Sequence, residues 1–316
     1  MNIAILLATY NGSKFIEAQI ESIIANDNYN LISKIVITDD GSTDNTVELV
    51  KKYKNVLFIE NTSTEHGPSA NFFNGLKYCK GMDYVFFCDQ DDIWFNKKIS
   101  IFVENIPKLN KDFPGVIYSN LELIDSAGRY MGKTFFENES IPYNWSCKIN
   151  HLYLQNCAPG CSMLINSNAV NRIVDTYSNQ IVMHDWWVLL FASLYKNVVV
   201  IPECTAGYRQ HDGNAVGATK KLSLLSIPSI FTRSRNNLKK VVLQLNLFER
   251  SLSIDEINML TKKEMKIMRY IVSLNKLNKL NKTATFMSRM KLIFCFARYK
   301  SSIVRDVVTR LFFINI

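Results

Sequence analysis

Three carboxylates lie within four consecutive residues, at Asp89, Asp91 and Asp92, with Gln90 after the first of them. An apolar segment, residues 84–88, comes directly before them. Carboxylates this close repel one another, so they stay ionised only beside a cation or several hydrogen-bond donors. Their oxygens suit a hard divalent cation such as Mg²⁺ or Mn²⁺, which would neutralise the charge of a departing diphosphate. The alternative is a solvated acidic turn.

A second polar cluster, residues 9–12, also follows an apolar segment and contains Thr9, Tyr10 and Asn11. A turn between a strand and a helix exposes backbone N–H groups, which suit an anion or the polar edge of a base. The cluster is not a Walker A loop, and no GxGxxG occurs in the chain. NTP hydrolysis and dinucleotide binding are therefore poorly supported.

A third cluster, residues 39–44, begins with Asp39 and Asp40 and contains Gly41, which permits a tight turn. The two carboxylates would accept hydrogen bonds from a base or a ribose. The alternative is a turn followed by a helix cap, supplied by Asp44, and the two roles are compatible.

Residues 184–187, His-Asp-Trp-Trp, open a predicted helix. We interpret Asp185 as a general base near the floor of the crevice, and Trp186 and Trp187 as aromatic side chains that stack on a sugar. The alternative for Asp185 is a capping role or a favourable interaction with the helix dipole.

Residues 208–211 contain Arg209 and one of only four histidines, His211. A lone histidine is more often structural than a ligand. The guanidinium of Arg209 would contact a phosphate through two parallel hydrogen bonds or pair with an acid.

These clusters have to be positioned by the elements before them. Over the first 120 residues, strand and helix patterns alternate, and the strands are continuously apolar, which is typical of a parallel sheet covered on both faces. The sequence predicts an α/β fold with a doubly wound, mostly parallel sheet flanked by helices. Because ligands of such sheets lie beyond the carboxyl ends of the strands, the three clusters should line one crevice. The predicted strands are residues 3–8, 34–38, 56–60 and 84–88, and the predicted helices are residues 13–25, 44–53 and 68–79.

Beyond residue 120 the pattern is mixed, and from residue 219 the chain is helical and basic. Strands are predicted at 115–119, 160–166, 198–202 and 205–211, a helix at 182–194, a long polar stretch at 134–157 and a linker at 226–229.

Charge is divided unevenly along the chain, whose net charge is +9. Residues 220–316 contain 20 Lys and Arg against five acids, a net of +15, which leaves −6 for residues 1–219. An acidic body with a basic tail indicates chemistry in the body and attachment in the tail. Apolar and charged fractions of 47% and 21% exclude wholesale disorder.

The cysteines and the apolar segments indicate in which cellular compartment the protein is expected. Seven cysteines without a CxxC pair favour a reducing compartment over a disulfide framework. The first residues lack a basic region, so we expect a first strand there and not a signal peptide. No apolar run reaches about 18 residues, so no transmembrane helix is expected.

Taken together and in this order, six motifs resemble those of family-2 glycosyltransferases, which have the GT-A fold. The resemblance covers residues 1–218 and implies a GT-A catalytic domain there, with residues 219–316 as a helical, basic C-terminal region. The motif versions look most like the rhamnosyltransferase-like branch that builds bacterial surface polysaccharides. The motifs are residues 8–12, 39–44, 67–76, 89–94, 184–187 and 208–211.

The resemblance implies an inverting, metal-dependent transfer of a sugar, rhamnose by motif likeness, from a UDP- or dTDP-type nucleotide sugar to a saccharide or lipid-linked acceptor in O-antigen or capsule synthesis. Asp185 would deprotonate the acceptor hydroxyl, and Trp186 and Trp187 would contact the acceptor or sugar. Many members of the family have Glu-Asp where this chain has His184 and Asp185. The role of the base can therefore be transferred to Asp185, but the family's acceptor contacts cannot be transferred. Implied donor contacts are Thr9, Tyr10, Asn11, Asp39, Asp40, Asp89 and Gln90, and implied ligands of Mn²⁺ or Mg²⁺ are Asp91, Asp89 and His211.

Other functions remain open beside this one. A nucleotidyltransferase would ordinarily carry a Gly-rich loop with Arg after its first strand, which residues 9–14 lack. A glycoside hydrolase would not need a nucleotide crevice. A non-catalytic sugar-nucleotide or membrane-binding protein on the same fold is the main alternative, and loss of the carboxylate motif or of Asp185 would favour it.

Residues 286–316 interleave basic with apolar side chains, as in an interfacial amphipathic helix. A lipid-linked acceptor would give such a helix a purpose, so we expect a cytoplasmic protein attached peripherally to the inner face of the cytoplasmic membrane. The alternative is a helix packed on the catalytic domain or on another subunit. Nucleic-acid binding is not expected, because no recognised module occurs.

Overall fold

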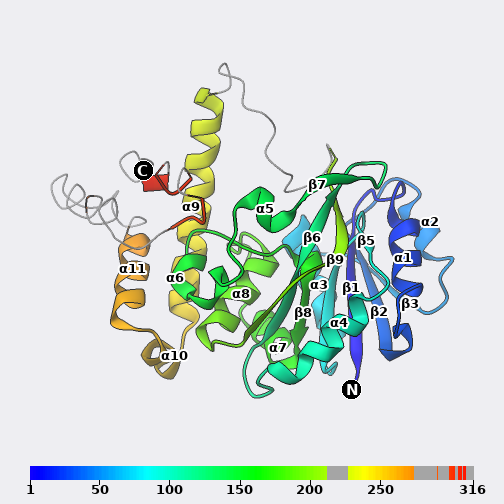
Figure 1. Ribbon diagram of the computed structural model, residues 1–316, viewed down its shortest axis with the longest axis horizontal. Coiled ribbons are helices and arrows are strands. Elements are labelled where there is room, and N and C mark those ends of the chain that lie inside the picture. The colour runs from blue at the N-terminus through cyan, green and yellow to red at the C-terminus, as the bar shows by residue number, and fades with distance from the viewer. Residues whose placement is uncertain (212–226, 274–289, 291–298, 303–304, 308, 311–316) are drawn as a thin grey trace.

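The computed structural model describes residues 1–211, 227–273, 290, 299–302, 305–307 and 309–310 (Figure 1). Strands and helices alternate through the first part of the chain, and the last three helices follow without intervening strands. The strands are β1 (Ile3–Thr9), β2 (Ile32–Asp39), β3 (Val56–Glu60), β4 (Tyr84–Asp89), β5 (Ile93–Trp94), β6 (Val116–Ile124), β7 (Tyr130–Thr134), β8 (Met163–Asn166) and β9 (Val198–Arg209). The helices are α1 (Ile16–Ile24), α2 (Thr46–Val50), α3 (Pro68–Leu76), α4 (Lys98–Asn105), α5 (Phe135–Glu139), α6 (Ile149–Leu152), α7 (Ser167–Asp175), α8 (His184–Leu194), α9 (Ile227–Ser251), α10 (Ile254–Met259) and α11 (Lys262–Ser273).

One sheet runs through the body in the order β3-β2-β1-β4-β8-β6-β9-β5, and β7 pairs with β6. β3, β2, β1 and β4 are parallel to one another, as the sequence predicts. β8 is antiparallel to both of its neighbours, whereas β6 and β9 are parallel. The parallel half confirms the expected α/β class, and the other half is mixed.

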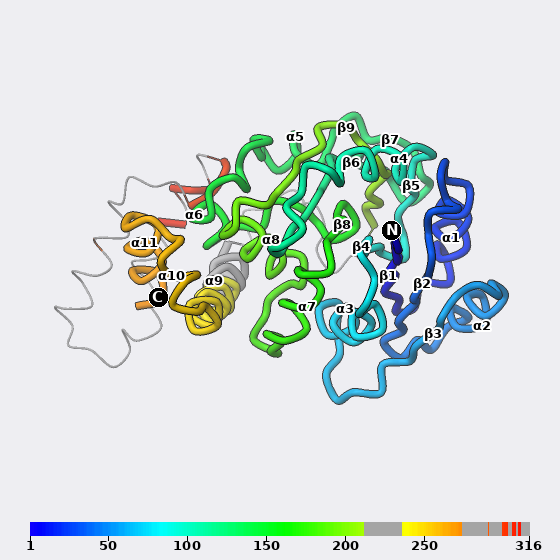
Figure 2. Tube along the Cα trace, turned by 90° about the horizontal axis from the view of Figure 1, so that it is seen from below, coloured from blue at the N-terminus to red at the C-terminus, as the bar shows by residue number. Residues whose placement is uncertain are grey.

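Alternate residues of β1 face two separate cores. Ile3, Ile5 and Leu7 belong to an apolar cluster that includes residues of α1 and α4, and Ala4 and Leu6 to another that includes residues of α3, α7 and α8. In Figure 2 these two groups of helices lie on opposite sides of the sheet. Successive side chains of a strand point to opposite faces, so a strand covered on both sides is apolar throughout.

Two stretches of the second half differ from the sequence prediction. The strands predicted at 198–202 and 205–211 are one long strand, β9, whose register against β6 shifts at Asn120. The stretch 134–157 is not simply polar, because it contains α5 and α6 and buries Phe136, Trp145 and Leu152. Helices this short leave no clear periodicity in a sequence.

The C-terminal helices pack on the body. The ring of Phe248 in α9 lies 5.9 Å from that of Trp187 and 5.1 Å from that of Phe191, both in α8. Arg172 of α7 forms an ion pair with Glu256 of α10. For these helices the structure favours packing on the body over a detached tail. Most of residues 286–316 lie outside the described residues, as does the expected boundary at residue 218.

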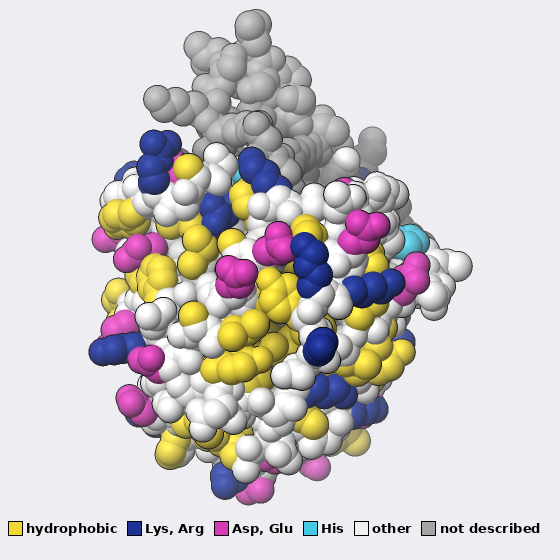
Figure 3. All heavy atoms as spheres, turned by 90° about the vertical axis from the view of Figure 1, so that its right-hand side faces the viewer, with side chains coloured by type: hydrophobic (Ala, Val, Ile, Leu, Met, Phe, Trp, Pro, Cys, Tyr) yellow, Lys and Arg dark blue, Asp and Glu magenta, His cyan; other side chains and the backbone are white. Residues whose placement is uncertain are grey.

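Charges of both signs are interspersed on the face that carries α1 and α2, with apolar side chains between them (Figure 3). Within the described segments, no helix combines the length and the apolar character that crossing a bilayer requires.

Candidate active site

A cavity of about 1060 Å³ opens where β1 and β4 end, beside the first turns of α3 and α8. All three polar clusters contribute to its lining, as the doubly wound pattern predicts. Thr9 and Tyr10 come from the first, Asp40 from the second, and Asp89 and Asp91 from the third. The opposite wall is formed by residues 156–160, the start of α8 and the region of α5.

Asp39 and Asp40 have different surroundings. Asp39 is buried and does not line the cavity, since its carboxylate accepts hydrogen bonds from Thr9 Oγ1 at 2.7 Å and from the Ser42 N–H at 2.7 Å. Asp40 lines the cavity and accepts a hydrogen bond from the Gly67 N–H at 2.6 Å. Of the two carboxylates, Asp40 is therefore the one that faces the cavity, and Asp39 holds the turn.

Gln90 joins the first and third clusters. Its Oε1 accepts a hydrogen bond from the Tyr10 N–H at 2.9 Å, and its Nε2 donates to the Tyr10 carbonyl at 3.0 Å. A Cβ at Gly12 would lie 2.1 Å from Gln90 Oε1, so this clamp requires glycine there. Asn11 does not line the cavity, and its Oδ1 accepts from the Thr43 N–H at 2.8 Å. The expected donor contact by Asn11 is thus replaced by a structural one, while Tyr10 stays exposed at the rim.

The end of β9 meets the third cluster. Nε2 of His211 lies 2.7 Å from Oδ2 of Asp91. Arg209 donates from Nε to the Asp91 carbonyl at 2.6 Å and from its backbone N–H to Asp92 Oδ1 at 3.0 Å. Arg209 is buried, and these two hydrogen bonds give it a role in organising the acidic turn.

The acidic turn fits a divalent cation. Burial, Asp92 and Asp91 hold the pKa of the Asp89 carboxyl well above its usual range, and burial and Asp91 raise the pKa of Asp92 to about 7. A cation would offset this repulsion. Asp91 lines the cavity and is hydrogen-bonded to His211, which brings a carboxylate and an imidazole together. Asp89, Asp92 and Cys161 also place possible ligand atoms close to one another, but Asp92 and Cys161 are buried.

Asp185 lies in the first turn of α8 and lines the cavity, although only 3% of it is exposed. Burial raises the pKa of its carboxyl to about 7, while hydrogen bonds from the N–H groups of Trp186 and Gly160 and from Asn156 oppose that rise. A carboxyl with this pKa is partly ionised at neutral pH and is able to accept a proton. Sequence reasoning did not identify Asn156 or Gly160, because neither belongs to a recognisable motif.

His184 is buried beside this carboxyl. Its ring stacks on Phe72 with centroids 3.8 Å apart and meets Phe87 edge-on at 4.9 Å. Neither ring nitrogen has a hydrogen-bond partner among the described residues, and burial lowers the pKa of His184 to about 3. A Cβ at Gly160 would lie 2.6 Å from Nε2, so the neutral imidazole supports the glycine that donates to Asp185.

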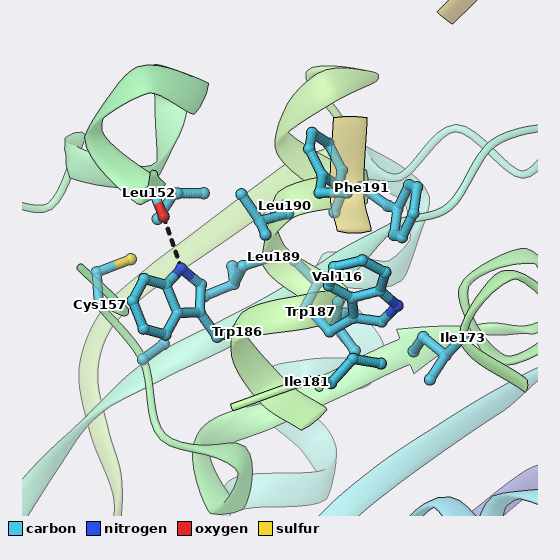
Figure 4. Packing of buried hydrophobic residues seen from close by; sticks show 14 of the residues in the cluster. Val116, Leu152, Cys157, Ile173, Ile181, Trp186, Trp187, Leu189, Leu190 and Phe191 are labelled. Atoms are coloured by element: carbon cyan, nitrogen blue, oxygen red, sulfur yellow. Dashed lines mark hydrogen bonds between the residues drawn. The ribbon is translucent and has the colours of Figure 1, made fainter. Parts of the chain in front are cut away.

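The two tryptophans point to different places (Figure 4). Trp186 lines the cavity, and its Nε1 donates to the Leu152 carbonyl at 2.6 Å. Trp187 is fully buried, lies among Ile173, Ile181 and Phe191, and does not line the cavity. The expectation that both indoles contact a sugar is therefore corrected for Trp187. Adjacent residues of a helix point about 100° apart, so only one of them faces the cavity.

Several known proteins are similar to this chain, among them two bacterial transferases. The dTDP-rhamnosyl transferase RfbG of Shigella flexneri is 28% identical over 226 residues, which cover 67% of this chain and 74% of that protein. The UDP-Glc:alpha-D-GlcNAc-diphosphoundecaprenol beta-1,3-glucosyltransferase WfgD of Escherichia coli is 28% identical over 165 residues, 52% of this chain and 59% of that protein.

A solved structure of Staphylococcus aureus TarS, residues 1–349 in complex with UDP-GlcNAc, superimposes on this chain with a TM-score of 0.55 at 15% identity. The superposition covers 99% of this chain and 90% of the TarS chain. This likeness confirms the GT-A type of fold. The model of the family described as Glycosyl transferase family 2 matches residues 4–173. With the three polar clusters and the buried carboxyl of Asp185 gathered in one cavity, the chain belongs to glycosyl transferase family 2.

Proposed function

We propose that this chain transfers a sugar from a nucleoside diphosphate donor to a hydroxyl group of a saccharide acceptor, with inversion at the anomeric carbon, in the synthesis of a surface polysaccharide. The observation that carries the proposal is the position of Asp185, which lines the same cavity as the acidic turn and the two strand-end turns. Family membership and the names of RfbG and WfgD support the reaction class.

The donor nucleoside binds at the end of the cavity formed by Thr9, Tyr10 and Asp40. Asp40 supplies hydrogen-bond acceptors, and the exposed ring of Tyr10 supplies a stacking surface. Asp89 lines the same cavity and interacts electrostatically with Asp185, so its carboxylate would contact the ribose or the transferred sugar. The likeness to RfbG makes a dTDP-sugar, with rhamnose as the sugar, the first donor to test, and UDP-sugars the second.

Asp91 and His211 hold a Mn²⁺ or Mg²⁺ ion in this proposal, with Asp89 as a further ligand. When bound, such an ion stabilises the negative charge that develops on the leaving diphosphate. The chain's own contribution is to fix the two ligands, which it does through Arg209 and its hydrogen bonds to the acidic turn.

Asp185 acts as the base. Its carboxylate takes the proton of the acceptor hydroxyl, and the oxygen attacks the anomeric carbon on the face opposite the diphosphate. The bond between that carbon and the phosphate oxygen breaks, and the diphosphate leaves with the electron pair. A single displacement of this kind inverts the anomeric configuration. The near-neutral pKa of Asp185 suits a group that must be ionised before the step and protonated after it.

The cytoplasmic face of the cytoplasmic membrane is the proposed place of action. The net charge of +15 over residues 220–316 favours an anionic surface, and the relative WfgD is named for a polyprenol-linked substrate. The test is flotation of the full chain with vesicles. Binding to vesicles containing phosphatidylglycerol, lost at high salt, supports the proposal, and equal recovery with pure phosphatidylcholine contradicts it.

The function itself is tested by thermal stabilisation with UDP-, dTDP- and GDP-sugars, each with and without Mn²⁺ or Mg²⁺. A ligand that binds the native state raises the melting temperature by mass action. We expect one nucleotide class to stabilise the chain, and to do so more strongly with metal. If no sugar nucleotide changes the melting temperature under any condition, the transferase proposal is wrong.

A further inference from the structure

The described part of the C-terminal segment, residues 299–302, 305–307 and 309–310, is fixed to the wall of the cavity. Ser301 donates from its N–H to Gln155 Oε1 at 2.8 Å, and Gln155 Nε2 donates back to Ser301 Oγ at 2.8 Å. Ser301 Oγ also donates to the Glu139 carbonyl at 3.2 Å. Lys300 donates to the Leu154 carbonyl, and burial lowers its pKa to about 8. In Figures 1 and 2 the described pieces of this segment, coloured red, lie near α6.

The segment is also organised internally. Oδ1 of Asp306 accepts hydrogen bonds from the N–H groups of Tyr299 and Lys300, at 2.5 and 3.0 Å, and its Oδ2 accepts from Arg310 Nε at 2.8 Å. Tyr299 is buried in the larger apolar cluster. These contacts indicate a defined position for the helical residues 305–307, which include Arg305.

Arg305 lines the cavity and forms an ion pair with Glu139 at the end of α5. Both side chains line the cavity, and they are 39% and 21% exposed. Arg305 is the one Lys or Arg among the described residues that line it. The carboxylates of the lining are those of Asp40, Asp89, Asp91, Glu139 and Asp185.

The charge balance at this end decides which ligand fits. The carboxylate of Glu139 cancels the charge of Arg305, so among the described residues a phosphate here would meet Glu139 and the other lining carboxylates without a net positive partner. A sugar hydroxyl is both donor and acceptor, and the ion pair offers guanidinium N–H groups and carboxylate oxygens side by side. Asn138 adds an amide, and Ile141 an apolar surface for the C–H face of a ring.

We propose that the Glu139–Arg305 ion pair binds hydroxyl groups of a neutral saccharide, and that Arg305 therefore makes the C-terminal segment part of the acceptor subsite. The proposal rests on the proposed function, in which the nucleoside occupies the other end of the cavity. It gives the C-terminal region a role in selecting the acceptor, besides any role in attachment.

The test uses the full chain, saturated with the nucleoside diphosphate that stabilises it and with Mn²⁺. Binding of an array of octyl glycosides of common hexoses, deoxyhexoses and N-acetylhexosamines is measured by calorimetry. Arg305→Met should weaken binding of the tightest of them roughly tenfold, as expected for loss of a charge-assisted hydrogen bond. The matched control is Arg269→Met, because Arg269 also pairs with a glutamate, Glu249, in the C-terminal region and does not line the cavity. The control should bind the glycoside as the unmodified chain does.

Unchanged glycoside affinity in Arg305→Met overturns the proposal, as does failure of every octyl glycoside to bind the unmodified chain. The glycosyl phosphate of the same sugar is measured alongside. If Arg305→Met weakens binding of this phosphate but not of the octyl glycoside, Arg305 binds a phosphate and the assignment to hydroxyls is wrong. If Arg305→Met does not fold, a double variant, Glu139→Arg with Arg305→Glu, exchanges the two charges and keeps an ion pair. A changed order of affinity among the glycosides in this double variant supports the proposal, and an unchanged order contradicts it. If no nucleotide sugar raises the melting temperature of the unmodified chain, the proposed function itself is wrong.

Discussion

Oδ2 of Asp91 and Nε2 of His211 are 2.7 Å apart, although 120 positions separate the two residues in the chain. The short strand β5 pairs with β9, with Ile93 opposite Gly207, which brings the end of β9 beside the acidic turn. Arg209 then holds the turn through the Asp91 carbonyl and Asp92 Oδ1. The two ends of the proposed metal site thus depend on one strand pairing.

The first prediction concerns this pair. His211→Ala should leave the fold intact and reduce the extra thermal stabilisation that Mn²⁺ gives in the presence of a nucleoside diphosphate, because one ligand is lost. Asp91→Asn should remove most of that metal-dependent part. Melting curves with nucleotide, with and without Mn²⁺, measure the effect. Full metal-dependent stabilisation in Asp91→Asn would show that the cation lies elsewhere.

A pH dependence follows from the raised pKa of Asp185. Burial puts that pKa near 7 in the free protein, and a base acts only when it is deprotonated. The value of kcat/KM should therefore rise with pH through about 7 and level off above it. A profile of kcat/KM from pH 5 to pH 9, at fixed free Mn²⁺, checks this. A flat profile across neutral pH would argue against Asp185 as the base.

Gly160 is a position where a single methyl group should disturb catalysis. A Cβ there would lie 2.6 Å from His184 Nε2, and the Gly160 N–H donates to Asp185. Gly160→Ala should cost roughly 1–3 kcal/mol of folding free energy and lower kcat with little change in donor affinity. Adding His184→Ala makes room for the methyl group and should recover part of the stability. Denaturant unfolding and steady-state kinetics of both variants test the point, and a fully stable, fully active Gly160→Ala would contradict it.

The two tryptophans should separate stability from acceptor binding. Trp187 is fully buried and donates from Nε1 to Thr176 Oγ1 at 2.9 Å, so Trp187→Phe should cost roughly 1–3 kcal/mol of folding free energy and leave the KM for acceptor unchanged. Trp186→Phe should raise that KM, because Trp186 lines the cavity. Urea unfolding and steady-state kinetics test this. If Trp187→Phe instead raised the KM for acceptor and left the stability unchanged, Trp187 would be a sugar contact after all.

The N-terminal half of the fold could be predicted from sequence because its signals are local. The strand predicted at 56–60 has the same bounds in the structure, and β1 and β4 extend one residue further than predicted. β1 and β4 are continuously apolar since both of their faces are covered. The residues after them therefore had to meet at one edge of the sheet, and the structure brings them together there.

The rest of the site depends on contacts between distant segments. Nothing local in residues 134–157 or 299–310 indicates that Glu139 and Arg305 would meet across 166 positions. Asp39 and Asp40 are adjacent and chemically identical, so only the path of the turn decides which one faces the cavity. The same holds for Trp186 and Trp187, whose difference lies in helix rotation.

The most direct measurement compares Asp185→Asn with the unmodified chain, using the nucleotide sugar that stabilises it and an acceptor that it glycosylates. Asparagine keeps the size of the side chain but cannot take the proton of the acceptor hydroxyl. Donor-induced stabilisation should be preserved, and the rate of transfer should fall by roughly a hundredfold or more. Transfer at an undiminished rate in Asp185→Asn would contradict the assignment of the base, and with it the proposed single displacement.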